Sequence, residues 1–333
     1  MTNMLKILQL IRYKNLIFIA FIQYLMHETI FLPIIQKPEY GFTETLSGHI
    51  LWLLILSTVL IAAGGYVLND YFDYKIDKIN HPEKQIIGTY ISKQTAMLLH
   101  QILTFGGTIA GLALSWYARS FTLAFIFVVV PGLLWFYSAS YKRQFLIGNL
   151  TVSFVSGLSV LVVAIFGLAF MKKEYSGFIY ETTIPSDVQG WIGAFALFAF
   201  LLTFIREIIK DMEDEHGDRE LECRTMPIVW GIAKTKIFVV GLITLVVALL
   251  LVANYNFIHF DGNLTIKYIA SGVILPLFIL AYLVIRAKSS PDFQQAAAFS
   301  KFIMLTGVLY SFVFYYLMAK LYGLTLFNVF VLK

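Results

Sequence analysis

The sequence predicts an all-α integral membrane protein with nine transmembrane helices, and its composition and its repeated apolar stretches carry this prediction. Of the 333 residues, 59% are hydrophobic and 14% are charged, whereas a soluble domain carries roughly 25% charged residues. The 30 Phe and 19 Tyr residues bring more apolar surface than a solvated, disordered chain tolerates. The composition therefore excludes a soluble globular enzyme and a disordered protein.

Each predicted helix is an apolar stretch of about 20 residues, the length that crosses a bilayer. The nine stretches run over approximately 15–35, 48–69, 95–117, 121–140, 148–170, 190–209, 237–255, 267–286 and 302–320. The segment before the first stretch lacks the cleavage site of a signal peptide, so we expect that stretch to remain as a helix. A count of eight or ten helices stays open.

The distribution of Lys and Arg predicts a cytoplasmic N-terminus. With that orientation, 18 of the 25 Lys and Arg residues lie in cytoplasmic segments. The other seven are Lys37, Arg119, Lys172, Lys173, Lys267, Lys320 and Lys333. After nine crossings the C-terminus lies outside, and the two longest polar loops, at about 70–94 and 210–236, lie inside. We expect the chemistry there, in the inner or cell membrane of a bacterium or archaeon.

The net charge and the cysteine content exclude several other classes of site. The formal net charge of +5 fits basic cytoplasmic loops, so it indicates no nucleic-acid partner. The single cysteine, Cys223, cannot form an intramolecular disulfide, and no closely spaced Cys and His residues offer a zinc site.

Two acidic motifs repeat at the ends of the second and sixth predicted helices. Residues 69–77 read NDYFDYKID and residues 210–218 read KDMEDEHGD, and both carry Asp at spacings of three and four. Such spacing places three carboxylates on one helical face. Four crossings separate the two helices, so both motifs emerge on the same side of the membrane. The six aspartates are Asp70, Asp73, Asp77, Asp211, Asp214 and Asp218.

Six converging carboxylates predict a site for Mg²⁺, which takes oxygen ligands and leaves room for substrate phosphates. In the simpler interpretation, acidic residues lie here because polar loops begin here. Lys75, Lys78 and Lys210 would then be surface ion partners, each pair of little energetic value. The repetition of the spacing on one membrane side favours the metal site.

These motifs resemble the two signatures of the UbiA superfamily of intramembrane prenyltransferases, NDxxDxxxD after the second helix and a DxxxD-type motif after the sixth. The segment REIIKDMEDEHGDRELECRTMPIVWG is most similar to the digeranylgeranylglyceryl phosphate synthase branch. The resemblance covers nearly the whole chain and implies one domain over 1–333, a helical bundle around a central cavity open to lipid, and a cap made by the two acidic loops. It also implies Mg²⁺-dependent transfer of an isoprenyl group, which we expect to be geranylgeranyl, from its diphosphate to a lipophilic acceptor.

The implied chemistry suggests a role for each candidate residue. The six aspartates and Asn69 would hold the metal, and Lys84, Lys142, Arg143 and Lys210 would contact the diphosphate. Aromatic faces stabilise a carbocation, and the candidates at the right depth are Tyr71, Phe72, Tyr137 and Tyr141. Arg12 and Asn15 match polar positions of relatives and would face the acceptor.

The acceptor and the class of protein leave alternatives open. The pattern near the second motif favours a glycerol-phosphate lipid as acceptor, and the runner-up is an aromatic ring such as hydroxybenzoate or naphthoate. A divalent-cation transporter is the alternative from another class. A transporter would place ionisable residues near the membrane midplane, whereas these carboxylates gather at one face.

Overall fold

The computed structural model describes residues 3–40, 42, 48–80, 85–258, 260–326 and 330–331. Within these ranges, nine helices are long and apolar enough to cross a membrane, which confirms the predicted number. Their elements are α2, the π-helical segment η1 and α3 (Tyr13–Leu25, Met26–Phe31 and Leu32–Ile35), α4 (Gly48–Asn80), α5 (Lys93–Tyr117), α6 (Phe121–Ala139), α7 (Ile147–Tyr175), α8 (Ile184–Glu213), α11 (Ile232–Asn256), α12, η5 and α13 (Leu264–Ile269, Ala270–Ile274 and Leu275–Arg286) and α14 (Ser290–Tyr322).

Short elements lie at the ends of the long helices. They are α1 (Asn3–Leu10), the 3-10 turns η3 (Tyr141–Arg143) and η4 (Ser176–Glu181), α9 (Glu215–Glu220), α10 (Met226–Trp230) and two strands, β1 (Thr325–Leu326) and β2 (Phe330–Val331). The strands pair in an antiparallel hairpin that the sequence did not predict.

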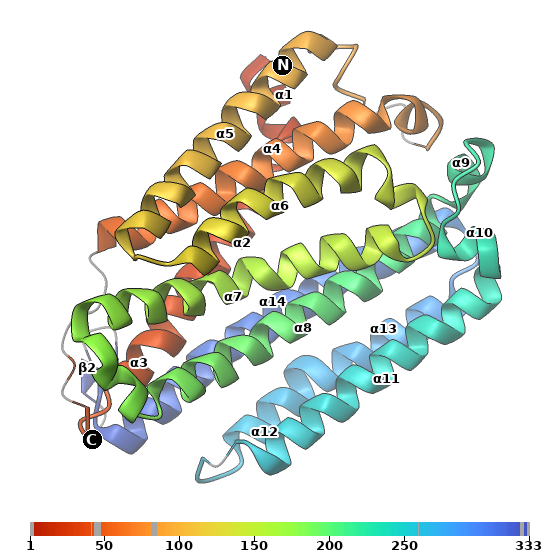
Figure 1. Ribbon diagram of the computed structural model, residues 1–333. Helices are drawn as coiled ribbons and strands as arrows, with labels where there is room; N and C mark the ends of the chain where they lie inside the picture. Colours follow the sequence, from red (N-terminus) through yellow and green to blue (C-terminus); the bar gives the residue numbers. More distant parts are fainter. Residues whose placement is uncertain are drawn as a thin grey trace.

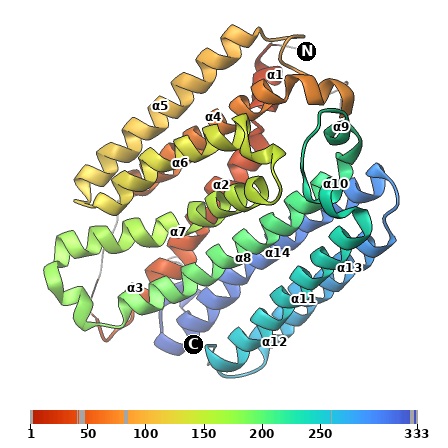
Figure 2. The ribbon, with the colours of Figure 1, turned by 45° about the vertical axis from the view of Figure 1, so that its right-hand side comes forward.

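The long helices form a bundle in which α7, α8 and α14 occupy the middle (Figure 1). Helices α4, α5 and α6 pack on one side of this group, and α11 and α13 pack on the other, as Figure 2 also shows. The N-terminus lies at the same end of the bundle as α9 and α10, and the C-terminus lies at the opposite end (Figure 1). This arrangement agrees with an odd number of crossings.

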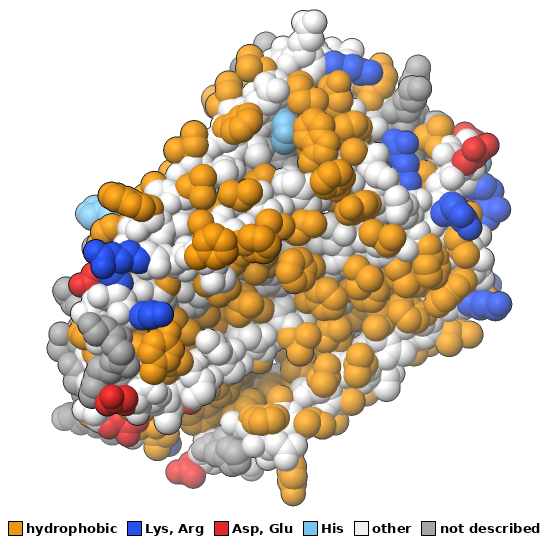
Figure 3. Space-filling view, viewed as in Figure 1, with side chains coloured by type: hydrophobic (Ala, Val, Ile, Leu, Met, Phe, Trp, Pro, Cys, Tyr) orange, Lys and Arg blue, Asp and Glu red, His pale blue; other side chains and the backbone are white. Residues whose placement is uncertain are grey.

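The surface of the bundle is suited to lipid. Apolar side chains cover the middle of the face shown in Figure 3, and Lys and Arg gather toward the ends of the helices. Large aromatic residues such as Trp116, Phe121 and Tyr255 are more than four-fifths exposed. An exposed apolar surface of this kind is stable in a bilayer and not in water.

Small residues bring α4 and α5 into close contact. The Ser57 hydroxyl donates a 2.7 Å hydrogen bond to the carbonyl oxygen of Gly107. A Cβ atom at Gly107 would lie only 2.8 Å from the carbonyl oxygen of Ser57, so a glycine is needed there. Further along the same interface, a Cβ atom at Gly64 of α4 would lie 2.2 Å from the Thr104 hydroxyl of α5. This close packing fixes the direction of α4, whose far end carries the first acidic motif.

The helices that carry the acidic motifs are longer than the predicted spans. The apolar stretch of α4 ends near residue 69, but the helix continues to Asn80, and α8 continues to Glu213. Residues 70–80 and 210–213 are therefore helical, where the sequence analysis expected the start of loops. The acidic side chains thus stand on rigid helix ends.

Candidate active site

A cavity of about 520 Å³ lies between α2, α4, α6, α7, α8 and α14. Its inner part is apolar and includes Phe18, Ile22, Phe195, Phe198 and Val308. Charged, amide and phenol groups gather at the end where the acidic motifs lie. They are Arg12, Lys14, Asn15, Tyr66, Asn69, Tyr137, Arg206, Glu207, Lys210 and Lys301. A cavity that is polar at one end and apolar at the other suits an amphipathic molecule with an anionic head.

The first acidic motif borders this polar end. Arg12 lies in a left-handed turn between α1 and α2, with φ 52°, and its guanidinium donates a 2.8 Å hydrogen bond to Asp70. Burial alone would lower the pKa of Arg12, but the neighbouring Asp70 carboxylate raises it. Arg12 is therefore a fixed cation at the mouth of the cavity. The guanidinium also lies 5.1 Å from the centre of the Tyr66 ring.

Asp73 lies one turn after Asp70 on α4 and is held by two partners. The Asn69 amide donates a 2.7 Å hydrogen bond to Asp73, and the Lys142 ammonium forms an ion pair with the same carboxylate. The Lys142 ammonium also donates a 3.3 Å hydrogen bond to the side-chain amide oxygen of Asn69. Lys142 comes from η3, so this network joins α4 to the connection between α6 and α7.

The second acidic motif spans the junction of α8 and α9. Asp211 accepts a 2.8 Å hydrogen bond from the Asn149 amide of α7. Asp214 stands between the two helices, and Asp218 is buried on α9, 8% exposed. Burial and the neighbouring Asp214 raise the pKa of Asp218 to about 7.

The two motifs face one another across the cavity mouth. Asp218 interacts electrostatically with Asp73 and Lys142 as well as with Asp214, and helix α9 packs against α4. This proximity is expected for two motifs that emerge on the same side of the membrane. These interactions join Asp73, Asp214 and Asp218, and Asp211 interacts with Asp218. Asp70 lies one turn before Asp73 on α4.

The carboxylates of the two motifs determine which kind of divalent-metal site is possible here. Among the described residues, no three carboxylate, imidazole or thiol groups lie close enough to hold one ion by themselves. Mg²⁺ usually binds through one or two carboxylates together with substrate phosphates and water, and not in an all-protein cage. Carboxylates of two motifs at the mouth of a cavity fit such an open site. The side chain of Asp77 lies outside the described residues.

The predicted diphosphate contacts fall into separate places. Lys142 is part of the acidic network described above. Arg143 is exposed and lies within electrostatic range of Cys223, near Asp218. Lys210 lines the cavity, with its ammonium 3.8 Å from a Glu207 oxygen. Lys84 lies outside the described residues.

One of the four aromatic candidates lines the cavity, and the other three do not. Tyr137 lines it, within electrostatic range of Asp73 and Glu207. Tyr71 instead contacts the apolar cluster of α1 and α5, Phe72 packs edge-on against Trp135, and Tyr141 stacks on Phe136. The physical reason on α4 is helical geometry, because residues next to Asp70 point about 100° away from its face.

Several polar residues of the site were not among the predicted site residues. Arg206, Glu207 and Lys301 line the cavity, and Asn149 holds Asp211. Their sequence position could have indicated that Arg206 and Glu207 belong to the site, since they lie one turn before the second motif. For Lys301 the sequence gives only a helix end, so its place on the cavity wall could not be predicted.

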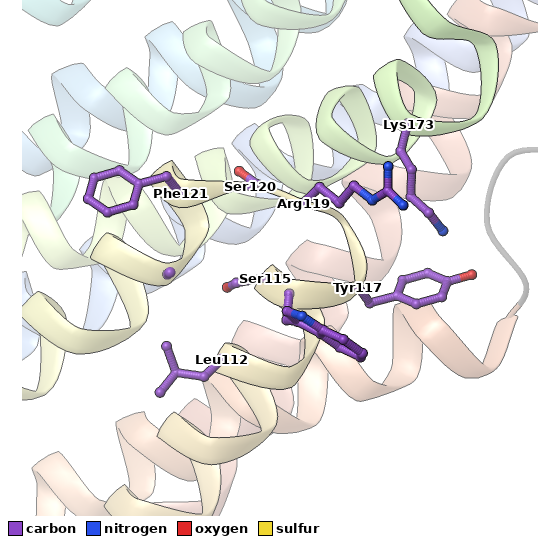
Figure 4. A pocket seen from close by; sticks show the side chains of 9 residues that line it. Leu112, Ser115, Tyr117, Arg119, Ser120, Phe121 and Lys173 are labelled. Carbon is purple, nitrogen blue, oxygen red and sulfur yellow. The ribbon is translucent and has the colours of Figure 1, made fainter.

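A second hollow, of about 670 Å³, lies where α5 meets α6, at the opposite end of the bundle from the acidic motifs. Figure 4 shows the side chains of Arg119 and Lys173 on the same side of it, near Tyr117. The Lys173 ammonium lies 3.9 Å from the centre of the Tyr117 ring. No carboxylate lines this hollow in the described part of the chain, so it is separate from the candidate active site.

Comparison with known proteins identifies the family. The UbiA prenyltransferase family model matches residues 40–306. The digeranylgeranylglyceryl phosphate synthase of Saccharolobus solfataricus is 33% identical over 264 residues, which cover 79% of this chain and 83% of the relative.

Two solved structures share the fold. A structure of digeranylgeranylglyceryl phosphate synthase in membranes matches with a TM-score of 0.60 and 21% identity, over 94% of this chain and all of that one. A UbiA homologue from Archaeoglobus fulgidus bound to GPP and Mg²⁺ matches with a TM-score of 0.55 and 14% identity, over 92% of this chain and 99% of that one. The resemblance seen in the acidic motifs is thus confirmed, and the chain belongs to the UbiA prenyltransferase family, as a membrane-embedded enzyme that transfers prenyl groups.

Proposed function

We propose that this enzyme transfers a geranylgeranyl group from its diphosphate to the hydroxyl of a glycerol-phosphate lipid, with Mg²⁺ as cofactor. The observation that carries the proposal is the meeting of two acidic helix ends at the polar mouth of an apolar cavity. The similarity to the digeranylgeranylglyceryl phosphate synthase of Saccharolobus solfataricus supports the choice of acceptor. The homologue bound to GPP and Mg²⁺ supports the choice of donor and metal.

The metal would be held by the aspartates of both motifs. The donors would be Asp70, Asp73 and Asp77 of the first motif and Asp211, Asp214 and Asp218 of the second. Asn69 would orient Asp73, to which its amide donates a hydrogen bond. When bound, Mg²⁺ supplies neutralisation of the diphosphate charge and a template for its orientation. Lys142 and Arg143, together with Lys84, would take the remaining phosphate oxygens.

The reaction begins with cleavage of the allylic carbon–oxygen bond. Both electrons of that bond leave with the diphosphate oxygen, and an allylic carbocation remains in the cavity. The acceptor hydroxyl oxygen then attacks the carbon, and its proton leaves to water or to a carboxylate at the mouth. Charge stabilisation at the departing oxyanion contributes most to such a step.

The protein would protect the cation with a cavity wall that is mainly apolar. Tyr137 lines the cavity within electrostatic range of Asp73 and Glu207, and its ring would face the positive charge. The deeper wall, with Phe18 and Phe195, excludes water and receives the isoprenoid tail. Arg12 and Asn15 line the same cavity and would contact the acceptor.

We propose the membrane topology that the basic residues predict. The N-terminus, α9 and α10 would lie in the cytoplasm, so the diphosphate would enter from the cytoplasmic side. The C-terminus would lie outside. The host membrane would be the cell membrane of a bacterium or archaeon.

The function is tested by incubating the purified protein with geranylgeranyl diphosphate, Mg²⁺ and a panel of acceptors, and by analysing the products with mass spectrometry. We expect a prenylated glycerol-phosphate lipid that disappears when Mg²⁺ is chelated. A product formed only with hydroxybenzoate or naphthoate would contradict the proposed acceptor. Mg²⁺ flux in liposomes without any prenylated product would contradict the proposed reaction.

A further inference from the structure

Three cations lie on the part of the cavity wall that α8 and α14 form. Arg206 and Lys210 lie one turn apart on α8, and Lys301 lies on α14, which packs against α8. All three line the cavity. Lys301 is within electrostatic range of both Arg206 and Lys210. We call these three residues the α8–α14 basic cluster.

The charge of this cluster is only partly compensated. Glu207 forms an ion pair with Arg206 and lies 3.8 Å from the Lys210 nitrogen, so one carboxylate serves two cations. Lys301 makes no hydrogen bond or ion pair with any residue that the structure describes. The Nε atom of Arg206 is buried without a hydrogen-bond partner among the described residues. Lys301 is exposed and lines the cavity, so these cations can donate charge-assisted hydrogen bonds to an anionic ligand there.

A mainly apolar strip continues into the cavity from Arg206 and another from Lys301. On α8 the strip leads from Arg206 through Ala199 to Phe195, and on α14 it leads from Lys301 through Leu305 to Val308. Both strips follow helical spacing, so they lie on the cavity side of their helices. The cluster therefore faces the head of a ligand whose hydrocarbon tail lies deeper in the membrane.

The cluster is distinct from the groups that we assign to the diphosphate. Lys142 and Arg143 come from η3, whereas the cluster comes from α8 and α14. The two places meet on α8, where Asp211 of the second motif directly follows Lys210. Tyr137 is within electrostatic range of Asp73 on one side and Glu207 on the other. Two anionic heads bound at the two places would thus share one reaction space.

We propose that Arg206, Lys210 and Lys301 bind the phosphate monoester of the acceptor lipid, at a site separate from the diphosphate. This inference rests on the proposed function, because it specifies how the acceptor of that reaction is recognised. A phosphate monoester carries about two negative charges near neutral pH, which the cations of the cluster can neutralise. The planar guanidinium of Arg206 and the ammonium of Lys301 are suited to its oxygens. Lys210, which the sequence analysis placed with the diphosphate, belongs to the acceptor side in this proposal.

The test compares Lys301→Met with Lys320→Met, a lysine at the opposite end of the same helix. We expect Lys301→Met to raise KM for the phosphate-bearing acceptor roughly tenfold or more, the usual effect of losing a charge-assisted hydrogen bond. The KM for geranylgeranyl diphosphate should stay unchanged. With a neutral acceptor that lacks the phosphate, wild type and Lys301→Met should react equally, and Lys301→Arg should restore the phosphate acceptor. Lys320→Met should behave as wild type.

A second measurement does not depend on turnover. The phosphate-bearing acceptor, added without Mg²⁺ or donor, should raise the thermal unfolding temperature of the wild type and of Lys320→Met but not of Lys301→Met. If this shift is the same in all three proteins, or if Lys301→Met raises KM for the donor instead, the proposed site is overturned. Equal losses with the phosphate and the neutral acceptor would also overturn it, since they indicate a structural role. Failure of the wild type to form any product would count against the proposed function, and the thermal shift would still test the site.

Discussion

Asp73 carries more contacts than any other described aspartate of the first motif. Asn69 donates a hydrogen bond to it and Lys142 forms an ion pair with it. Asp218 approaches this network from α9. A carboxylate held from several sides keeps a fixed position, which a metal and diphosphate site requires.

Removing one of these charges should impair catalysis without unfolding the protein. We expect Asp73→Asn and Asp218→Asn each to lower kcat for prenyl transfer by roughly 10²–10³-fold, the range for loss of one group that stabilises developing charge. Product formation is followed by mass spectrometry at saturating Mg²⁺. The matched control is Asp261→Asn, an exposed aspartate of the loop before α12, which should retain full activity. Near-normal activity of Asp73→Asn would remove that residue from the site.

Metal binding should depend on pH through Asp218. The pKa of this carboxyl is about 7 in the metal-free protein, and Mg²⁺ competes with the proton. The affinity for Mg²⁺ should therefore rise roughly tenfold between pH 6 and pH 8, measured as the Mg²⁺ concentration that gives half of the maximal thermal shift. In Asp218→Asn this increase should disappear, and an unchanged pH dependence in that variant would contradict the assignment.

The same group affects the stability of the metal-free protein with the opposite sign. Its folded pKa lies above the value of about 3.9 for an unfolded Asp. The protonated form is favoured in the folded state, so this contribution is complete below about pH 4 and is lost as the pH rises through 7. Mg²⁺ should restore the stability that is lost on the alkaline side.

At the scale of elements, the contact between α4 and α5 sets the position of the first motif. Two neighbouring glycines of α5 allow a matched test of it. A Cβ atom at Gly107 would meet the Ser57 carbonyl at 2.8 Å, whereas one at Gly106 would meet only Leu60, at 4.0 Å. We expect Gly107→Ala to lower the free energy of unfolding by about 1–3 kcal/mol, as overpacking does, and Gly106→Ala to leave it nearly unchanged. Thermal unfolding in detergent measures both variants, and equal stabilities would show that the helices can separate without cost.

Helix ends were predicted less well than helix centres. The sequence placed the last helix at 302–320, but α14 begins at Ser290 with a capping box formed by Ser289 and Asp292. Hydropathy could not detect its first three turns, because Gln294, Gln295 and Lys301 lower the apolar average there. Polar residues are tolerated in this part of the helix because it lies near the polar end of the cavity, which Lys301 lines.

The acidic motifs could be predicted because their information is local. The spacing of Asp70 and Asp73 fixes their common face within a single helix. The electrostatic interaction of Arg206 with Lys301 is different, since it arises only when α8 packs on α14. The sequence also does not show in which direction an aromatic side chain points, and only Tyr137 of the four aromatic candidates lines the cavity.

At the scale of the molecule, the proposed topology places α9 and the loop before α12 on opposite sides of the membrane. In a Cys223→Ser background, we expect Asp261→Cys to react with a membrane-impermeant maleimide on intact cells, and Glu220→Cys to react only after lysis. In the wild type, the Cys223 thiol is buried, and burial and the neighbouring Asp218 raise its pKa to about 11. The unmodified wild type should therefore react slowly on either side of the membrane. The reverse labelling pattern would invert the proposed orientation.

The size of the cavity limits what it can enclose. A volume of about 520 Å³ is in the range of a pocket for one drug-sized molecule. A donor and an acceptor that each carry a long isoprenoid tail exceed it, so part of their hydrocarbon must remain among the surrounding acyl chains during the reaction. The enzyme would then meet its substrates in two dimensions. Its turnover in vesicles should follow their mole fraction in the bilayer, and dilution with inert phospholipid should slow it even when the bulk concentrations are held constant.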